Sequence, residues 1–201
     1  MAWTSPRTWV VGEVVTAALM NTHVRDNFLA LYPDIATSLP GSPYNDKFAT
    51  LTDSLTAPTW QWTFRYLSAA SSNKWKFQYG TPMRNTPLTV GSANITTYAF
   101  TSTQLTVPRT GSYDVTLMAP YVVGGGARPR LTVGVNATGD DTFSVSGGTP
   151  VSAGSVNVGF NYTWRRTFTA GDALSIGYRI EVGSIGWSAP VEMRLLPAEV
   201  T

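Results

Sequence analysis

Few acidic residues in this chain stand where they could do chemistry. Asp140 and Asp141 share a glycine-flanked turn, in which two carboxylates and backbone carbonyls could hold a Ca²⁺ ion. Because no third carboxylate is close in sequence, we favour a solvated turn whose Asp side chains satisfy local backbone groups. Glu181 and Glu192 lie on expected strands and could face each other as the carboxylate pair of a glycoside hydrolase. Since no acidic residue stands in a diagnostic motif, polysaccharide degradation is the least favoured function.

Two further motifs resemble functional sites only in part. His23 is the single histidine, and the chain has no cysteine. Without a partner ligand or a neighbouring nucleophile, we assign His23 a packing or capping role. The segment at residues 124–130, GGGARPR, lacks the Lys-Ser/Thr of a phosphate-binding loop and is typical of a flexible connector. We therefore expect no enzymatic activity, no cofactor and no metal.

Composition excludes several other classes of function. The 201 residues carry a net charge of only +2, and their basic residues are scattered, which argues against nucleic-acid binding. No apolar run approaches the ~20 residues that span a bilayer, so we expect no membrane insertion. Charged residues make up 13% of the chain, about half the usual share, while hydrophobic residues at 43% suffice for a core. Low charge together with many Thr, Ser and Gly residues is typical of extended, self-assembling β-proteins.

A strongly aromatic hairpin is expected between residues 60 and 79. Aromatic residues alternate with other residues along two runs separated by the bend SAASSN at 68–73. Strict alternation places all of them on one face of a strand pair. We favour a buried core over a surface that stacks on sugar rings. The alternating residues are Trp60, Trp62, Phe64, Tyr66, Trp75, Phe77 and Tyr79.

Short strands separated by turn signals fill the rest of the chain. Gly-containing pairs punctuate the sequence at short, regular spacing, and no helical periodicity interrupts it. This pattern predicts a mainly β fold, an antiparallel two-sheet sandwich. The expected strands are 95–100, 103–107, 112–122, 130–137, 141–146, 155–168, 173–182 and 190–196. We expect three parts: a docking arm and amphipathic helix at 1–32, a linker or collar with the aromatic hairpin at 33–85, and the sandwich at 86–201.

The first part differs from everything that follows it. An extended arm with apolar anchors leads to Thr16, an expected N-cap, and Pro33 ends the expected helix. Apolar residues then recur at three- and four-residue steps along one helical face. A lone helix is marginal by itself, so its apolar face must be covered by a copy of itself or by a larger assembly. The expected docking and oligomerisation residues are Trp3, Pro6, Trp9, Ala17, Met20, Val24, Phe28 and Leu31.

The segment at residues 5–27, with GEVVTAALMNTHVRDN after a Pro/Trp arm, resembles the N-terminal signature of tailed-bacteriophage virion proteins of the minor tail or tail-fibre type. It covers about an eighth of the chain. One departure is Ser5, where that signature has Thr. The resemblance implies a structural protein of the phage particle that is assembled in the host cytoplasm.

The C-terminal half resembles the jelly roll of the tumour-necrosis-factor and complement type. Its marks are Gly111 and Tyr113 at the entry to a central strand, the turn Ala170-Gly171-Asp172, and a final apolar strand. Such heads are typically homotrimers. The resemblance therefore implies a trimeric jelly roll displayed at the surface of the particle.

Together these observations predict a phage virion protein of the minor tail or tail-fibre type, displaying a trimeric β-sandwich for attachment to the host. A capsid-decoration or head-fibre protein would use the same architecture and stays open. The expected partners are the chain itself, other virion proteins, and a host-surface glycan or protein. Trp164 and Trp187 are candidates for contact with the host, although either Trp suits a core equally well.

Overall fold

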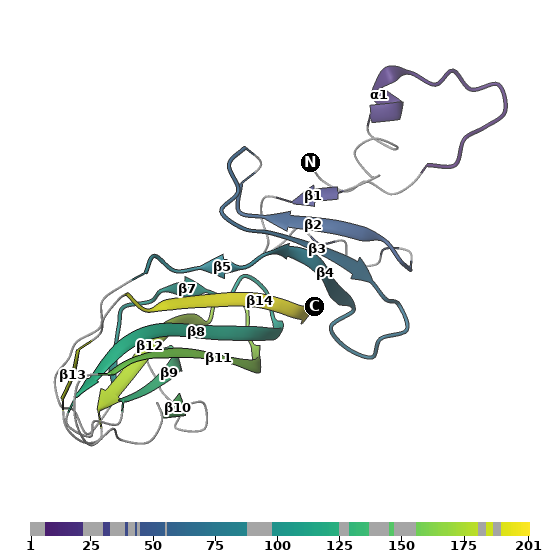
Figure 1. Ribbon diagram of the computed structural model, residues 1–201. Helices are drawn as coiled ribbons and strands as arrows, with labels where there is room; N and C mark the ends of the chain where they lie inside the picture. Colours follow the sequence, from purple (N-terminus) through teal and green to yellow (C-terminus); the bar gives the residue numbers. More distant parts are fainter. Residues whose placement is uncertain are drawn as a thin grey trace. The chain divides into compact units, whose positions relative to one another are not determined.

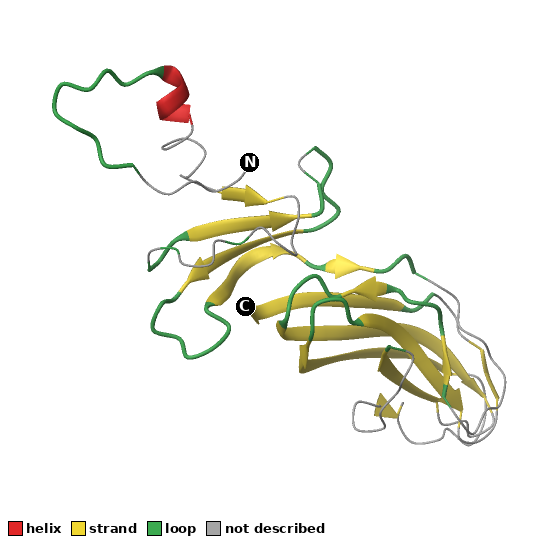
Figure 2. Cartoon of the chain, turned by 180° about the vertical axis from the view of Figure 1, so that it is seen from behind, coloured by secondary structure: helices red, strands yellow, loops and turns green. Residues whose placement is uncertain are grey.

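The computed structural model is mainly β, as the sequence predicts, and its sheets form a sandwich (Figure 1, Figure 2). It describes residues 7–21, 30–32, 39, 43, 45–54, 56–87, 98–124, 129–136, 145–146, 156–180, 184–186 and 190–201. The chain folds into two compact units. The N-terminal unit is Met1–Pro82 with Pro197–Thr201, and the sandwich unit is Met83–Leu196. Among the described residues, no helix is both long and apolar enough to cross a bilayer.

The N-terminal unit is built on a small sheet. Strand β2 (Phe48–Thr52) pairs antiparallel with β3 (Gln61–Tyr66), and β3 pairs antiparallel with β4 (Trp75–Thr81). A short strand, β1 (Ala30–Tyr32), lies parallel to β2, and the end of β14 (Glu192–Val200) lies antiparallel to β4. Strand β2 falls within the stretch expected to be a linker. Its residues FATLT are good strand formers, and Asp46, in the turn before it, has a left-handed φ of 67°.

The expected helix is wrong at its C-terminal end. Helix α1 comprises Ala17–Met20, and the Thr16 hydroxyl accepts the Leu19 N–H at 3.2 Å, which confirms the predicted N-cap. Leu31, expected on the helical stripe, lies in β1 opposite Thr50. Pairing with the β2 edge satisfies backbone groups of this segment, whereas a short isolated helix is marginal.

One layer of the sandwich unit contains β8 (Gly111–Gly124) between β11 (Val156–Phe168) and the first part of β14 (Figure 1). The short strands β13 (Ser184–Gly186) and β5 (Met83–Arg84) pair with β8 and β14.

The second layer runs in the order β10 (Val145–Ser146), β9 (Pro129–Val135), β12 (Ala173–Ile180) and β6 (Ala99–Phe100). The strand β7 (Leu105–Thr106) also pairs with β12. The expected strands at 112–122, 130–137, 155–168 and 173–182 are thus confirmed with shifts of a few residues.

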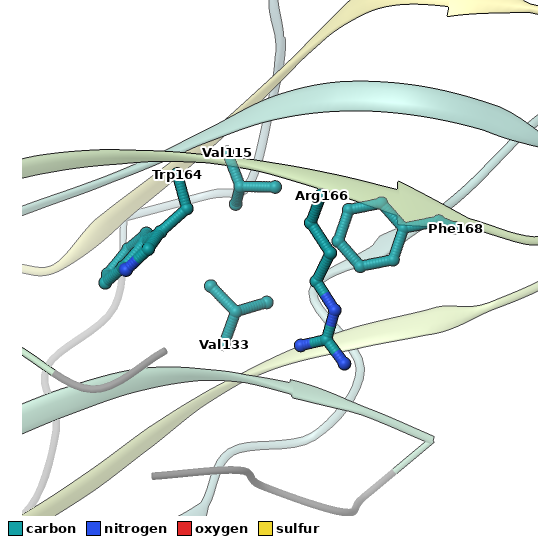
Figure 3. Close-up of a pocket in the computed structure, with 5 residues that line it drawn as sticks. All are labelled: Val115, Val133, Trp164, Arg166 and Phe168. Atoms are coloured by element: carbon teal, nitrogen blue, oxygen red, sulfur yellow. The ribbon is translucent and has the colours of Figure 1, made fainter. Parts of the chain in front are cut away.

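The sandwich core comes from alternate residues of these strands. Figure 3 shows Val115 of β8 opposite Val133 of β9, so the two layers meet through their apolar faces. Tyr113 is fully buried, and its hydroxyl donates to the Arg109 carbonyl at 2.7 Å. Burial raises the pKa of Tyr113 well above its usual range, so this hydroxyl stays a donor. The other fully or nearly fully buried residues of this core include Leu117, Ala119, Leu131, Leu174, Ile176, Val191, Met193 and Leu195.

The turn before β12 behaves as its sequence predicts. Gly171 has a φ of 91°, which favours glycine, and no atom lies near the position of a Cβ there. The Asp172 carboxylate accepts the Thr169 N–H at 2.8 Å and the Asn136 amide at 3.0 Å. Asp172 is therefore a turn residue.

Candidate functional site

Residues 7–20 of the N-terminal unit expose an apolar segment, which we call the apolar arm. Val10 is 70% exposed, Val11 fully so, and Val14 79%. Trp9, Val15 and Met20 are also exposed. Such a density of exposed large apolar side chains within a few residues is unusual for a monomeric protein and typical of an interaction segment.

Local contacts give the apolar arm its shape. The Arg7 guanidinium pairs with the Glu13 carboxylate and lies 5.6 Å from the centre of the Trp9 ring. The same carboxylate accepts the Val10 N–H at 3.3 Å, and the Glu13 N–H donates to the Val10 carbonyl at 3.0 Å. These contacts close a turn in which Gly12 has a φ of 85°. The polar groups of the arm are therefore engaged with one another while its apolar side chains stay exposed.

The predicted docking residues fall in several places. Trp9 is half-exposed on the arm, and Ala17 and Met20 lie exposed on α1. Leu31 is in β1. Trp3, Pro6, Val24 and Phe28 lie outside the described residues. Val11, Val14 and Val15 precede the helical stripe and do not belong to its periodicity, although the run WVVGEVV carries an apolar signal of its own.

The host-contact candidate Trp164 lies at an edge of the sandwich. It is half-buried on β11, with the Tyr162 ring 4.8 Å away between centroids. Figure 3 shows Trp164 and Arg166 extending from β11 towards Val133. The cavity between them measures about 10 Å³, about the room one water molecule needs, so it is no ligand pocket. Trp187 lies outside the described residues.

Five of the seven rings of the aromatic hairpin form a core, as predicted, and Phe77 is half-buried. Trp60, Trp62, Phe64, Tyr66 and Trp75 are all at most 6% exposed. Their rings contact one another, with 4.3 Å between the Trp60 and Trp62 centroids and 5.2 Å between those of Tyr66 and Trp75. These five rings are therefore buried and do not form a surface that could stack on sugar rings.

Tyr79 does not share the face of the other rings. Phe64 lies opposite Phe77, but Thr63 lies opposite Tyr79, so Gln78 is an extra residue on β4. This bulge turns Tyr79 to the opposite face of the sheet, where it is 62% exposed. The expectation that all seven rings share one face is wrong here, because alternation counts residues and cannot register a bulge.

An open cavity lies beside the exposed Tyr79 ring. Its volume is about 260 Å³, and it is lined by Pro58, Gln61, Thr63, Tyr79, Gly80 and Thr81. Gly80 is needed here, because a Cβ would come within 2.0 Å of the Gln61 carbonyl oxygen. All lining residues are uncharged. We call this the Tyr79 cavity.

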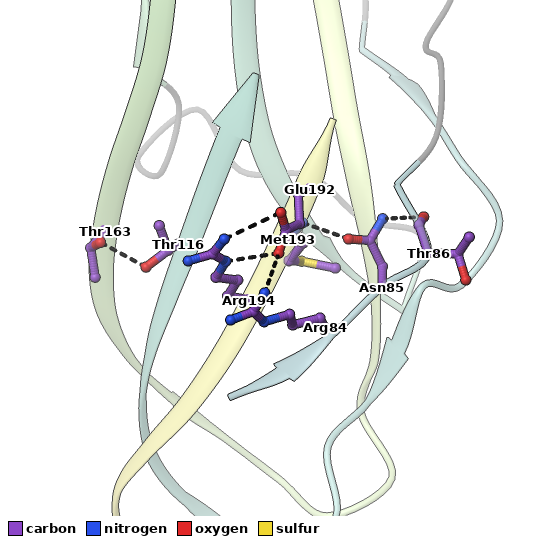
Figure 4. Close-up of polar contacts among 8 residues, drawn as sticks. All are labelled: Arg84, Asn85, Thr86, Thr116, Thr163, Glu192, Met193 and Arg194. Atoms are coloured by element: carbon purple, nitrogen blue, oxygen red, sulfur yellow. Dashed lines mark hydrogen bonds and ion pairs between the residues drawn. The ribbon is translucent and has the colours of Figure 1, made fainter. Parts of the chain in front are cut away.

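Glu192, the one carboxylate considered for catalysis that the structure describes, is poorly suited to act as a general acid. Figure 4 shows the Glu192 carboxylate paired with both Arg194 and Arg84. The Arg194 Nε atom lies 2.8 Å from the carboxylate, and the Arg84 Nη1 atom lies 3.7 Å from it. The hydrogen bond from Arg194 outweighs partial burial and lowers the pKa of Glu192, whereas a glycosidase general acid needs a raised pKa. Glu181, His23, Asp140 and Asp141 lie outside the described residues. Within the described ranges, no three His, Cys, Asp or Glu side chains gather to hold a metal ion.

No protein-family model matches the chain, and no curated protein sequence is similar to it.

Proposed function

We propose that this protein is a structural component of a tailed-phage particle, of the minor tail or tail-fibre type, and that it displays a trimeric β-sandwich for attachment to the host. The apolar arm and the segment after it dock the chain in the particle. Three sandwich units held together bind weakly one by one and strongly as a set, because the second and third contacts act at high effective concentration.

The apolar arm is the observation that carries this proposal. Its apolar side chains face solvent in the single chain, and burying a valine stabilises a complex by roughly 1.5 kcal/mol or more. Val10, Val11 and Val14 alone therefore contribute on the order of 5 kcal/mol per chain when a partner covers them. A segment that gains this much on docking favours an assembled state, in keeping with the resemblance at residues 5–27.

The sandwich unit supports a displayed, non-enzymatic role. Glu192 is held ionised by two arginines, and the cavity beside Trp164 has room for about one water molecule. A densely packed β-sandwich without a catalytic constellation in its described part is suited to presenting a surface. No observation favours a position on the capsid over a position on the tail.

The test introduces Val11→Asp and Val14→Asp together into the full chain. The chain has a mass of 21.7 kDa, so a trimer of three chains gives about 65 kDa in sedimentation equilibrium. We expect the native chain at the trimer mass and in purified particles, and the double variant absent from particles with its sandwich still folded. Ser71→Asp, a charge placed on an exposed bend, is the matched control and should assemble normally.

A native chain that stays at 21.7 kDa at micromolar concentration contradicts the trimer. Normal incorporation of the double variant into particles contradicts docking through the arm.

A further inference from the structure

We infer that the Tyr79 cavity of the N-terminal unit is a binding site for a neutral saccharide, recognised through the face of the Tyr79 ring. Its biological meaning rests on the proposed attachment role, and it names the chemical class of the host-surface ligand. The alternation of aromatic residues in the sequence predicts that Tyr79 lies in the core. Only the bulge at Gln78 brings its ring to the solvent face.

The exposed ring is the first observation. Tyr79 is 62% exposed, while the five most buried rings of the same hairpin fill the core of this unit. Bulges often re-aim a side chain next to a functional site. An aromatic face attracts positively polarised C–H groups, and a pyranose presents such groups on one side of its ring.

The walls of the cavity are held in place before any ligand binds. The loop that carries Pro58 is fastened by the Asp53 carboxylate, which accepts the Thr59 N–H at 3.0 Å and also the Thr59 hydroxyl. Partial burial opposes ionisation, but these hydrogen bonds outweigh it and lower the pKa of Asp53. Across the cavity, the Thr81 hydroxyl accepts the Gln61 N–H at 3.0 Å. A preorganised wall costs less entropy on binding.

Two polar groups at the cavity are available to a ligand. Neither the Gln61 side-chain amide nor the Tyr79 hydroxyl makes a hydrogen bond with another described residue. The amide offers both donors and an acceptor, and the phenol offers one of each. Hydroxyl groups at the edge of a sugar ring need this mixed set. The Tyr79 cavity therefore combines an apolar face with polar groups beside it.

The absence of charge at the cavity selects a neutral ligand. None of the six lining residues is an Asp, Glu, His, Lys or Arg. Arg65 and Lys76 share this face of the sheet by register, but each is held by a carboxylate. The Arg65 guanidinium lies 2.6 Å from Asp46, and the Lys76 amine pairs with Glu199. An anionic sugar thus meets no available cation among these groups.

Size limits the ligand further. The volume of about 260 Å³ is a little below the ~300 Å³ at which sites for drug-sized ligands begin. One or two sugar rings fit, and a longer chain would extend into solvent. For a single ring we expect a dissociation constant on the order of 1–10 mM. Three copies in one particle raise the avidity for a repeated surface glycan.

The experiment measures binding of methyl glycosides to the full chain by saturation-transfer NMR and titration. The neutral panel is glucose, galactose, mannose, rhamnose and the two N-acetylhexosamines, with glucuronate and glucosamine as charged probes. At least one neutral sugar should bind. Tyr79→Ala should weaken it about tenfold or more, and Tyr79→Phe about threefold or less, because the ring is kept.

Tyr162→Ala is the matched control, since Tyr162 is 46% exposed in the other unit, and it should bind the sugar normally. Should Tyr79→Ala fail to fold, Gln61→Ala should weaken binding in its place.

The inference is overturned if no neutral sugar binds at 50 mM, if Tyr79→Ala binds like the native chain, or if glucuronate binds best. Measuring whether the native chain binds host cells separates two outcomes, namely that the saccharide site is wrong and that the proposed attachment function is wrong. Cells bound without any sugar response leave the attachment role standing and remove this site. A sugar response without incorporation into particles leaves the site standing and removes the virion role.

Discussion

Replacing Asn85 with alanine tests how hydrogen bonds of the Asn85 side chain stabilise β14 in the sandwich unit. Asn85 is 5% exposed, and its side-chain carbonyl accepts the Met193 N–H at 2.6 Å. Its amide donates to the Thr86 carbonyl at 2.9 Å (Figure 4). The Asn85 N–H also donates to the Met193 carbonyl at 3.2 Å. The Asn85 side chain thus supplies the acceptor for the N–H of Met193, a fully buried residue of β14.

Asn85→Ala leaves the buried Met193 N–H without its acceptor. An unsatisfied buried donor costs about 1–3 kcal/mol, and the lost bond to Thr86 adds about 1 kcal/mol. We therefore expect a loss of about 2–4 kcal/mol in the free energy of opening this strand. Because 1.4 kcal/mol is a factor of ten, the β14 amides should exchange with solvent about 30- to 700-fold faster.

Hydrogen-exchange mass spectrometry on peptides covering residues 190–201 measures this acceleration. Asn161→Ala is the control, because Asn161 is exposed on β11 and its side chain has no hydrogen bond to a described residue. It should change the opening free energy by less than about 0.5 kcal/mol. An Asn85→Ala protein whose β14 amides exchange like those of Asn161→Ala would refute the reasoning.

Two further predictions concern the N-terminal sheet and the acidic range. Gly80→Ala should destabilise the N-terminal unit by about 2 kcal/mol or more, because its Cβ would lie 2.0 Å from a backbone oxygen. Urea unfolding followed by tryptophan fluorescence measures this. Gly171→Ala, with a φ of 91° but open space, should lose only about 1 kcal/mol, and equal losses would contradict the steric argument. The lowered pKa of Glu192 adds stability that is present above its unfolded pKa and lost as pH falls through the folded one. Glu192→Gln should therefore flatten the fall in stability below about pH 5, and an unchanged acid profile would exclude this contribution.

Several features of the fold could be predicted from local sequence. Thr16 caps a helix because a threonine hydroxyl can accept an N–H two or three residues on, whatever lies around it. Gly111 begins β8 and Gly171 turns the chain before β12, since both positions depend on local backbone chemistry. The buried rings of Trp62 and Phe64 follow from alternation and hydrophobicity.

Features that depend on pairing partners could not be predicted in this way. The Pro- and Ser-rich surroundings of β2 predict a linker, yet β3 supplies a partner for every residue of β2. Leu31 fits a helical stripe, but it pairs with the edge of β2. In both cases a long-range hydrogen-bond ladder overrides the local preference.

The strand-rich class, the aromatic core of the hairpin and the apolar character of the arm follow from which residues are apolar and how they repeat along the chain. The exposure of Tyr79 depends instead on strand pairing, because one extra residue on β4 inverts the alternation that its neighbours obey. The ion pair of Glu192 with Arg84 likewise depends on strand pairing, since the pairing of β5 with β14, and not sequence distance, brings Arg84 to Glu192.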